Sequence, residues 1–371
     1  MLGARSGLFE WILAVLACAA CAVFAIVGAA QSSPAGRRPV VASAAPIATS
    51  APVHVAPVTT APAVRTPKPA QAKVAVDLGK MGAVTLLHRT TIRSAASATS
   101  SAVSVAKGIT LPIDGIKGNW VHVMTPCELG GWIRASDAAL IAAGGPTSSF
   151  GQAVFVIDPG HGGSESGALA PDGVQEQDVN LAIARRLAKQ LKGSRVYLTR
   201  TGRYNVGLRF RALLASKLGA NAFLSMHENS GPVIPALGPG TQTWHQARSP
   251  ASAKLAAILY RNLYTTLSRY KVPWVSALKI GSLTRLNEKG ADYYAVLRES
   301  TVPAVIVESL FINNLAEEKL LKRADVQNAI AQATAKSIKQ FVMEGGAAKV
   351  APYPVKMDNS GGLPANCRDP R

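Results

Sequence analysis

Hydrophobic residues follow two different spacings along this chain of 371 residues. Between residues 74 and 140, apolar and polar side chains alternate in short runs separated by turn residues, which is the pattern of half-buried β-strands. The strand-like runs are 83–87, 108–113, 119–123 and 131–134. This spacing predicts a small β-barrel.

From residue 152 onward, short apolar runs alternate with longer stretches of helical periodicity. The strand-like runs are 153–157, 195–199, 222–226 and 302–307, and the helical stretches are 179–192, 207–218, 252–268 and 316–343. Strands that alternate with helices indicate an α/β fold, with a mostly parallel or mixed sheet flanked by helices. We expect this domain to cover residues 152–344, with one or two helices closing it.

Two further stretches lack such periodicity. Residues 31–73 are dominated by Ala, Pro, Val, Ser and Thr and carry basic but no acidic residues, so we expect an extended Ala/Pro-rich linker. Residues 345–371 return to Gly, Ala, Pro and Lys, and we expect a disordered tail there.

The N-terminal residues 11–30 form an uncharged apolar stretch about long enough to cross a bilayer as a helix. The small residues at 28–30 resemble a cleavage site, so residues 1–30 are either a signal peptide or a signal anchor, and both interpretations stay open. Both place the rest of the chain in the periplasm or cell envelope. A retained segment would also anchor it in the inner membrane.

Lysine and arginine outnumber aspartate and glutamate by 40 to 21, which gives a formal net charge of +19. This balance favours an anionic partner such as nucleic acid, acidic lipid or acidic wall polymer. No zinc-finger, RNA-recognition or KH signature accompanies the charge, and the N-terminus indicates export. We therefore expect no nucleic-acid partner.

The chain has four cysteines. Cys18 and Cys21 lie inside the apolar N-terminal stretch, where no lipobox surrounds them. Cys127 and Cys367 lie in separate predicted regions, and our default expectation is two unpaired thiols. A long-range disulfide between them stays open in an oxidising compartment.

Two histidines directly follow apolar strand-like runs. His161 lies in the sequence Asp-Pro-Gly-His-Gly-Gly after residues 153–157, and His227 follows residues 222–226. Because the carboxyl ends of parallel strands meet at one edge of a sheet, we expect the two imidazoles to converge. Glu176 opens the next helix and completes a His, Glu, His set. Three protein ligands leave the fourth position of a tetrahedral Zn²⁺ for water.

A further carboxylate, Glu308, ends the apolar run 302–307. A carboxylate at such a position is costly to bury unless it has a purpose. We therefore expect Glu308 to have a functional rather than a structural role.

Three polar residues near these motifs have competing interpretations. Glu165 is a rival metal ligand, but its loop has the composition of an exposed segment. Glu228 follows the second histidine and could alter substrate preference, tune a metal-bound water or face solvent, and we expect it to face solvent. His245 follows a strand-like run and is expected at the substrate cleft or at the surface.

Two arginines and two asparagines also lie close to the motifs. Arg200 and Arg211 are expected to pair with carboxylates inside the domain rather than to touch substrate. Asn229 and Asn313 either orient substrate or satisfy loop backbone, and the sequence leaves both open.

These motifs resemble those of the zinc-dependent N-acetylmuramoyl-L-alanine amidases, over residues 154–342. The matching segments are 158–163, Glu176 with 179–181, 198–200, 225–229 and 307–314. The resemblance implies that His161, Glu176 and His227 are the zinc ligands and that Glu308 is the catalytic carboxylate. The chain departs from the family pattern at Glu228, where a small residue is usual, and at 309–310, where a glycine is common.

The family cleaves the amide bond between the lactyl group of muramic acid and L-alanine in peptidoglycan. The resemblance therefore implies peptidoglycan as substrate, in cell-wall remodelling or daughter-cell separation, and it leaves a protein activator open. Two other functions also stay open: a non-catalytic wall-binding or regulatory protein, and a zinc peptidase that cuts within the stem peptide.

The preceding region, residues 74–140, resembles a bacterial SH3-like domain. The resemblance rests on residues 92–94, 107–108, 120–123 and 130–133. It implies a wall-binding or docking module. We expect Trp120 and Trp132 to lie in the core of this domain.

Overall fold

The computed structural model describes residues 77–371, apart from 233, 349–352, 354–361 and 365. The predicted signal segment 1–30 and linker 31–73 lie outside the described residues. None of the helices within the described part of the chain is both long and apolar enough to span a membrane.

A seven-stranded antiparallel sheet occupies residues 81–142, in the order β3-β2-β6-β5-β4-β1-β7. Its strands are β1 (Met81–Leu86), β2 (Thr90–Arg93), β3 (Ala102–Val105), β4 (Thr110–Lys117), β5 (Trp120–Met124), β6 (Gly130–Arg134) and β7 (Ala138–Ala142). The predicted strand-like runs overlap β1, β4, β5 and β6. The assignment of this part as SH3-like stays a prediction.

Our placement of the two tryptophans of this sheet in its core is wrong. Trp120 and Trp132 are both half-buried. The guanidinium of Arg134 lies over the Trp120 ring, with 5.0 Å from its carbon to the ring centroid. Smaller residues such as Val121 and Ile133 form the core instead. Side chains alternate between the two faces of a strand, so Trp120 and Trp132 lie on the face opposite to the core-facing Val121 and Ile133.

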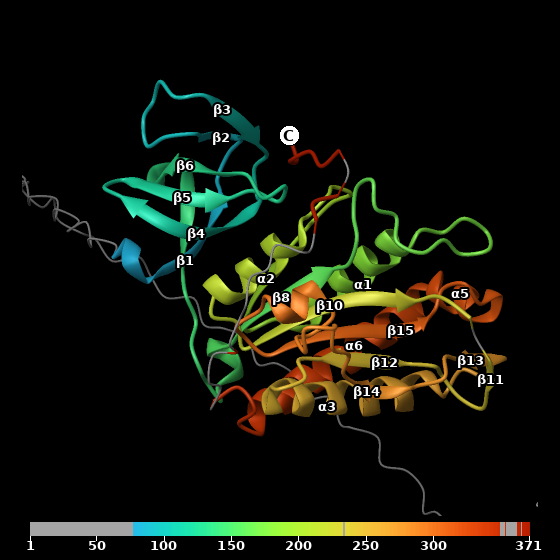
Figure 1. Ribbon diagram of the computed structural model, residues 1–371. Coiled ribbons are helices and arrows are strands. Elements are labelled where there is room, and N and C mark those ends of the chain that lie inside the picture. The colour runs from blue at the N-terminus through green and yellow to red at the C-terminus, as the bar shows by residue number, and fades with distance from the viewer. Residues whose placement is uncertain (1–76, 233, 349–352, 354–361, 365) are drawn as a thin grey trace, which may run out of the picture. The chain divides into compact units, whose positions relative to one another are not determined.

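A six-stranded mixed sheet forms the centre of residues 152–344, in the order β14-β12-β15-β10-β8-β9 (Figure 1). Its strands are β8 (Val154–Pro159), β9 (Arg195–Leu198), β10 (Ala222–Asn229), β12 (Gln242–His245), β14 (Gly281–Leu283) and β15 (Ala304–Phe311). The strands β9, β8, β10 and β15 run parallel, whereas β12 is antiparallel to β15. The expected mixed sheet flanked by helices is confirmed.

The helices cover both faces of this sheet. They are α1 (Glu176–Gln190), α2 (Leu208–Lys217), α3 (Pro250–Leu267), α4 (Ala295–Arg298), α5 (Leu315–Leu321) and α6 (Ala324–Met343). On one side α1, α3 and α6 pack together, and on the other α2 and α4 share a core with the small sheet. Successive residues of β8 therefore face opposite layers: Phe155 joins the first core and Val156 the second. This explains why β8 reads as a continuous apolar run.

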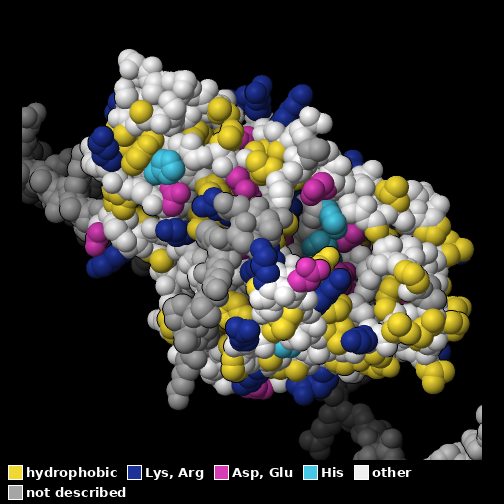
Figure 2. Space-filling model, in the orientation of Figure 1, with side chains coloured by type: hydrophobic (Ala, Val, Ile, Leu, Met, Phe, Trp, Pro, Cys, Tyr) yellow, Lys and Arg dark blue, Asp and Glu magenta, His cyan; other side chains and the backbone are white. Residues whose placement is uncertain are grey.

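Short elements complete the described structure. They are the 3-10 helices η1 (Leu78–Lys80), η2 (Ala135–Asp137) and η3 (Phe150–Gln152), and the separate antiparallel pair β11 (Ile234–Ala236) and β13 (Trp274–Ser276). Figure 2 shows hydrophobic side chains gathered over the end of the molecule that carries β11 and β13. Leu237 and Leu278, beside these strands, are strongly exposed.

The C-terminal residues correct two expectations. Cys127 and Cys367 form a disulfide rather than two unpaired thiols. The predicted disordered tail is also wrong for the described residues 366–371, since Pro370 O accepts a hydrogen bond from Ala106 N and the Asp369 carboxylate accepts one from Cys127 N. A separation of 240 residues hides such a pairing in the sequence, because only the fold brings the two cysteines together.

Candidate metal centre

The loop that carries His161 directly follows β8, at the end of the pairing between β8 and β10. His161 has a φ of 62° and Gly162 a φ of 138°, so the chain turns sharply here. A positive φ is uncommon for a residue other than glycine, and such strain persists only where the surroundings hold it. The turn directs the His161 side chain back across the carboxyl ends of the central strands.

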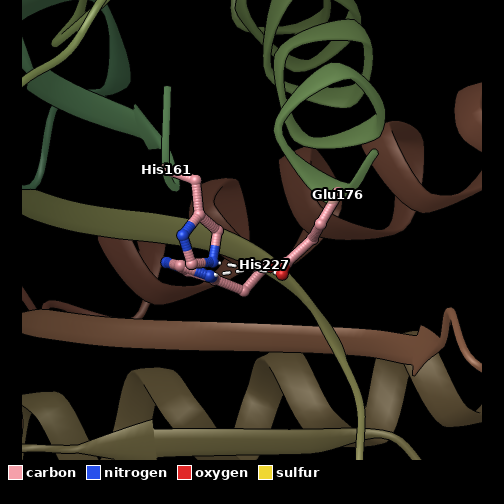
Figure 3. A group of neighbouring side chains, drawn as sticks. All are labelled: His161, Glu176 and His227. Atoms are coloured by element: carbon pink, nitrogen blue, oxygen red, sulfur yellow. Dashed lines mark hydrogen bonds and ion pairs between the residues drawn. The ribbon is translucent and has the colours of Figure 1, made fainter. Parts of the chain in front are cut away.

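The structure brings the three predicted ligands together (Figure 3). His161 follows β8, His227 lies on β10, and Glu176 is the first residue of α1. His161 Nε2 lies 3.1 Å from Glu176 Oε2, and His227 Nδ1 lies 2.9 Å from Glu176 Oε1. The three donor atoms lie within 4.8 Å of one another. Two imidazole nitrogens and a carboxylate oxygen so arranged match the ligand types that zinc prefers.

Glu176 is held as a carboxylate by several donors. It is 3% exposed, and it accepts hydrogen bonds from Ala168 N at 2.9 Å and from Asn180 Nδ2 at 3.2 Å. Burial alone would raise the pKa of Glu176, but the hydrogen bonds from His161 and His227 outweigh it and lower that pKa well below its usual range. The group is therefore ionised and oriented before any ligand arrives.

Two glycines leave room for this cluster. A Cβ on Gly160 would lie 2.2 Å from Nε2 of His227. A Cβ on Gly167 would lie 2.5 Å from Glu176 Oε2, and the φ of Gly167 is 70°. Both positions therefore require glycine, because any side chain there would overlap a donor.

A buried ion pair between Asp158 and Arg211 stabilises the loop that carries His161. Asp158 is fully buried and accepts hydrogen bonds from Arg211, Thr199 and, at 2.6 Å, Ser225 Oγ. Burial alone would raise the pKa of Asp158, but the Arg211 charge and the two hydroxyls hold it below its usual range. Arg211 also donates to His161 O at 2.9 Å.

Arg200 supports the same loop through backbone carbonyls. Its guanidinium donates to Pro159 O and Gly160 O, each at 2.9 Å, and to Gln177 O at 2.7 Å. The structural role expected for both arginines is confirmed, although Arg200 binds carbonyl oxygens rather than a carboxylate. The loop's own carbonyl groups were not visible as partners in the sequence.

Glu308 lies on β15 directly opposite His227 in the register of β10 and β15. Among the described residues, no hydrogen-bond partner reaches its buried Oε2 atom. Burial and then the charge of Glu176 raise the pKa of Glu308 to about 8, against the opposing effect of His161. A carboxyl group with a pKa near neutrality and a free oxygen is suited to accept and return a proton.

The surface near the ligands is partly open. The His161 side chain is 30% exposed and that of His227 is 21% exposed. On the face in Figure 2, histidine and acidic side chains lie next to one another. Glu165, the rival ligand, is exposed and is not among the converging donors.

One expectation for a neighbouring residue is wrong. Glu228 does not face solvent: it is 3% exposed, and burial raises its pKa well above the usual range. Glu228 shares one face of β10 with Leu224 and Met226, which lie in the core, so its burial follows from the alternation of side chains along the strand. His245 pairs with Val305 near the start of β15 and is half-buried, so its expected place at the substrate cleft or at the surface stays a prediction.

Gln242 is a neighbour that sequence reasoning missed. It pairs with Glu308 across β12 and β15, and its Oε1 accepts a hydrogen bond from Asn229 Nδ2 at 2.7 Å. Asn313 Nδ2 donates to Gly231 O at 2.9 Å. Both asparagines thus have partners within the protein. No motif marks Gln242, because its position opposite Glu308 depends on β12 running antiparallel to β15.

Comparison with known proteins gives consistent matches. A family model described as N-acetylmuramoyl-L-alanine amidase matches residues 155–340. The amidase AmiC of Escherichia coli O6:H1 is 30% identical over 222 residues, which cover 52% of this chain and 53% of AmiC. The amidase AmiA of E. coli K12 is 30% identical over 220 residues, which cover 51% of this chain and 76% of AmiA.

One solved structure illustrates the extent of the match. The amidase AmiC2 of Nostoc punctiforme is 29% identical, with a TM-score of 0.44, and the match covers 51% of this chain and 97% of that one. The matched part spans about half the length of AmiC from E. coli O6:H1.

Proposed function

This chain belongs to the N-acetylmuramoyl-L-alanine amidase family, and we propose that it hydrolyses the amide bond between N-acetylmuramic acid and L-alanine in peptidoglycan. We further propose that His161, Glu176 and His227 hold a zinc ion and that Glu308 is the catalytic carboxylate. The observation that carries the proposal is the convergence of these three donors beside a carboxylate of raised pKa.

The donor set fits zinc on physical grounds. Two imidazole nitrogens and one carboxylate oxygen lie within 4.8 Å of one another, and glycines at 160 and 167 leave the space that the ligands occupy. Three protein ligands leave one position open, as in catalytic zinc sites. Zinc held by His161, Glu176 and His227 would supply a Lewis acid for the scissile carbonyl and would lower the pKa of a water in the open position to about 7.

The chain's own residues supply the proton transfers. Glu308 takes a proton from the attacking water, whose oxygen forms a bond with the carbonyl carbon of the lactyl group. Glu308 then gives that proton to the L-alanine nitrogen as the carbon–nitrogen bond breaks, so that the stem peptide leaves with a free amine. Its Oε2 atom, which has no hydrogen-bond partner among the described residues, is free for this exchange.

The setting of the reaction follows from charge and from the N-terminus. A formal charge of +19 favours association with an anionic wall polymer. We propose an exported enzyme of cell-wall remodelling or daughter-cell separation. Anchoring by residues 11–30 and control by a protein activator remain parts of this proposal.

Digestion of purified sacculi, with products identified by mass spectrometry, tests the proposal. We expect glycan strands without stem peptides, together with free peptides that begin with L-alanine, and we expect a chelator to stop the reaction. Cut peptides still attached to glycan would indicate a zinc peptidase. Unchanged sacculi with bound protein would indicate a wall-binding protein.

Two variants assign the roles. Glu308→Ala is expected to lower turnover by about 10²–10⁴-fold, the usual contribution of a general acid–base group, while the variant still binds zinc. Glu165→Ala removes an exposed carboxylate from the same region and is the matched control, with turnover unchanged. Loss of zinc in Glu308→Ala, measured by metal analysis, would mean that Glu308 is a ligand instead.

A further inference from the structure

The register between β10 and β15 changes immediately beyond Glu308. His227 pairs with Glu308, but Asn229 pairs with Phe311, so β15 carries one more residue than β10 over this interval. A bulge of this kind leaves the extra residue outside the regular ladder of hydrogen bonds. Buried backbone N–H groups at the bulge then need other acceptors.

Two glutamates supply these acceptors. Glu228 Oε2 accepts a hydrogen bond from Leu310 N at 2.9 Å. Glu317 Oε2 accepts one from Phe311 N at 2.8 Å. Two consecutive N–H groups beyond Glu308 are therefore held by buried side-chain carboxyl groups.

Glu228 also contacts the ligand set. Its backbone N donates to Glu176 Oε1 at 3.2 Å, and it directly follows His227 in β10. One residue thus connects a candidate metal ligand with the end of the strand that carries Glu308. An amide at an exposed strand end would be satisfied by water, but Leu310 is fully buried, so it depends on this contact.

We propose that Glu228 is a positioning residue for Glu308. By accepting the Leu310 N–H, Glu228 holds the bulge that fixes Glu308 opposite His227. This role rests on the proposed amidase function. It differs from a purely structural one, because loss of the contact displaces a reacting group relative to the metal site, and small displacements of this kind are costly to turnover.

Substitutions at 228 in the full chain test this role. Glu228→Ala removes the acceptor, and we expect kcat to fall by about 10- to 100-fold, with KM and zinc content within about twofold of the parent. Glu228→Gln keeps an acceptor oxygen at the same reach and should restore kcat to within about threefold. Glu228→Asp keeps the carboxyl group but shortens its reach by one methylene, and it should lower kcat even if Glu228→Ala fails to fold.

Amide hydrogen exchange at Leu310 gives a readout that does not depend on activity. We expect exchange at least about tenfold faster in Glu228→Ala and Glu228→Asp, and parental protection in Glu228→Gln. Glu165→Ala, which removes an exposed carboxylate, is the matched control and should change neither kcat nor exchange.

Three results would overturn the proposal. One is a lower melting temperature in Glu228→Ala with kcat unchanged, which indicates a structural role alone. Another is an equal loss of kcat in Glu228→Gln, which means that the acceptor is not what matters. The third is parental exchange at Leu310 in the Ala and Asp variants. If the parent itself fails to cleave the muramoyl amide, the proposed function fails, whereas the exchange data still decide whether Glu228 holds Leu310.

Discussion

At the scale of single residues, glycines determine the shape of the candidate metal centre as much as its ligands do. The His227 ring occupies the space that a side chain at 160 would fill, and a Cβ on Gly167 would overlap both His161 and Glu176. These glycines therefore make room for the donors themselves.

Gly160→Ala is therefore expected to displace His227 and weaken zinc binding by about 10- to 100-fold, the range seen when groups that orient a metal ligand are disturbed. Zinc competition with a coloured chelator measures the effect. Gly145→Ala is the control, because a Cβ there meets nothing within 4 Å. Equal zinc affinity in the parent and in Gly160→Ala would contradict this assignment of space.

Residue-level reasoning worked where the chemistry is carried by strand ends. His161, Glu176, His227 and Glu308 come together because parallel strands share one edge, which the apolar runs before them already indicated. The expectation for Glu228 was wrong. Strand alternation places Glu228 on the same face as Leu224 and Met226, which lie in the core, so the period of the strand already indicated burial and the expectation of a solvent-facing side chain overlooked it.

At the scale of elements, the loop between β5 and β6 caps the N-terminus of helix α2. Glu128, with a φ of 61°, accepts hydrogen bonds through Oε1 from Arg209 N at 2.9 Å and from Phe210 N at 3.3 Å. Gly207 precedes the helix, and a Cβ there would lie 2.0 Å from the same oxygen. The small sheet thus supplies the N-terminal cap of a helix in the large domain.

Glu128→Ala leaves two N–H groups of α2 without this acceptor, and we expect the free energy of unfolding to fall by about 0.5–2 kcal/mol. Chemical denaturation of the parent and the variant measures the difference. Glu128→Gln keeps the oxygen and should lose less. An Ala variant as stable as the parent would show that the Glu128 contact does not stabilise the packing of the small sheet against α2.

Glu317 connects a second set of elements. Its carboxyl group accepts from Val275 N at 3.0 Å and from Phe311 N at 2.8 Å, tying β13 to the end of β15 at the start of α5. Burial raises its pKa from 4.5 to about 7, against the opposing effect of these two N–H groups. Folding therefore favours the protonated form.

The stability that protonated Glu317 contributes is present in full below about pH 4.5 and is lost as the pH rises through about 7. The free energy of unfolding should decline between pH 5 and pH 8 by up to about 3 kcal/mol more in the parent than in Glu317→Gln, which cannot ionise. Denaturation at the two pH values measures this difference. Parallel pH profiles would contradict it.

At the scale of the whole molecule, the sequence indicated a mixed sheet flanked by helices but not how the C-terminal residues return to the small sheet. Hydrophobic periodicity reports local structure, and a contact between Cys127 and Cys367 depends on the entire intervening fold. For the same reason the short strands β11, β12, β13 and β14 were not fully predicted. They lie within a long connection between β10 and β15 that carries weak periodicity.

The disulfide closes a loop of 240 residues, so breaking it should destabilise the fold by about 2–5 kcal/mol. Denaturation with and without a thiol reductant measures this in the parent. Cys367→Ser should match the reduced parent and show no further effect of reductant. Equal stability of the oxidised and reduced parent would mean that the bond is not formed in solution.

Hydrolysis in water enriched in ¹⁸O tests the central claim, muramoyl-amide cleavage at the His161, Glu176 and His227 centre, most directly. The zinc-loaded chain should place one ¹⁸O atom in the lactyl carboxylate of the glycan and leave unlabelled peptides with a free L-alanine amine. Glu308→Ala should give neither product at a comparable rate. Label in a peptide carboxylate, with the muramoyl amide intact, would contradict the account.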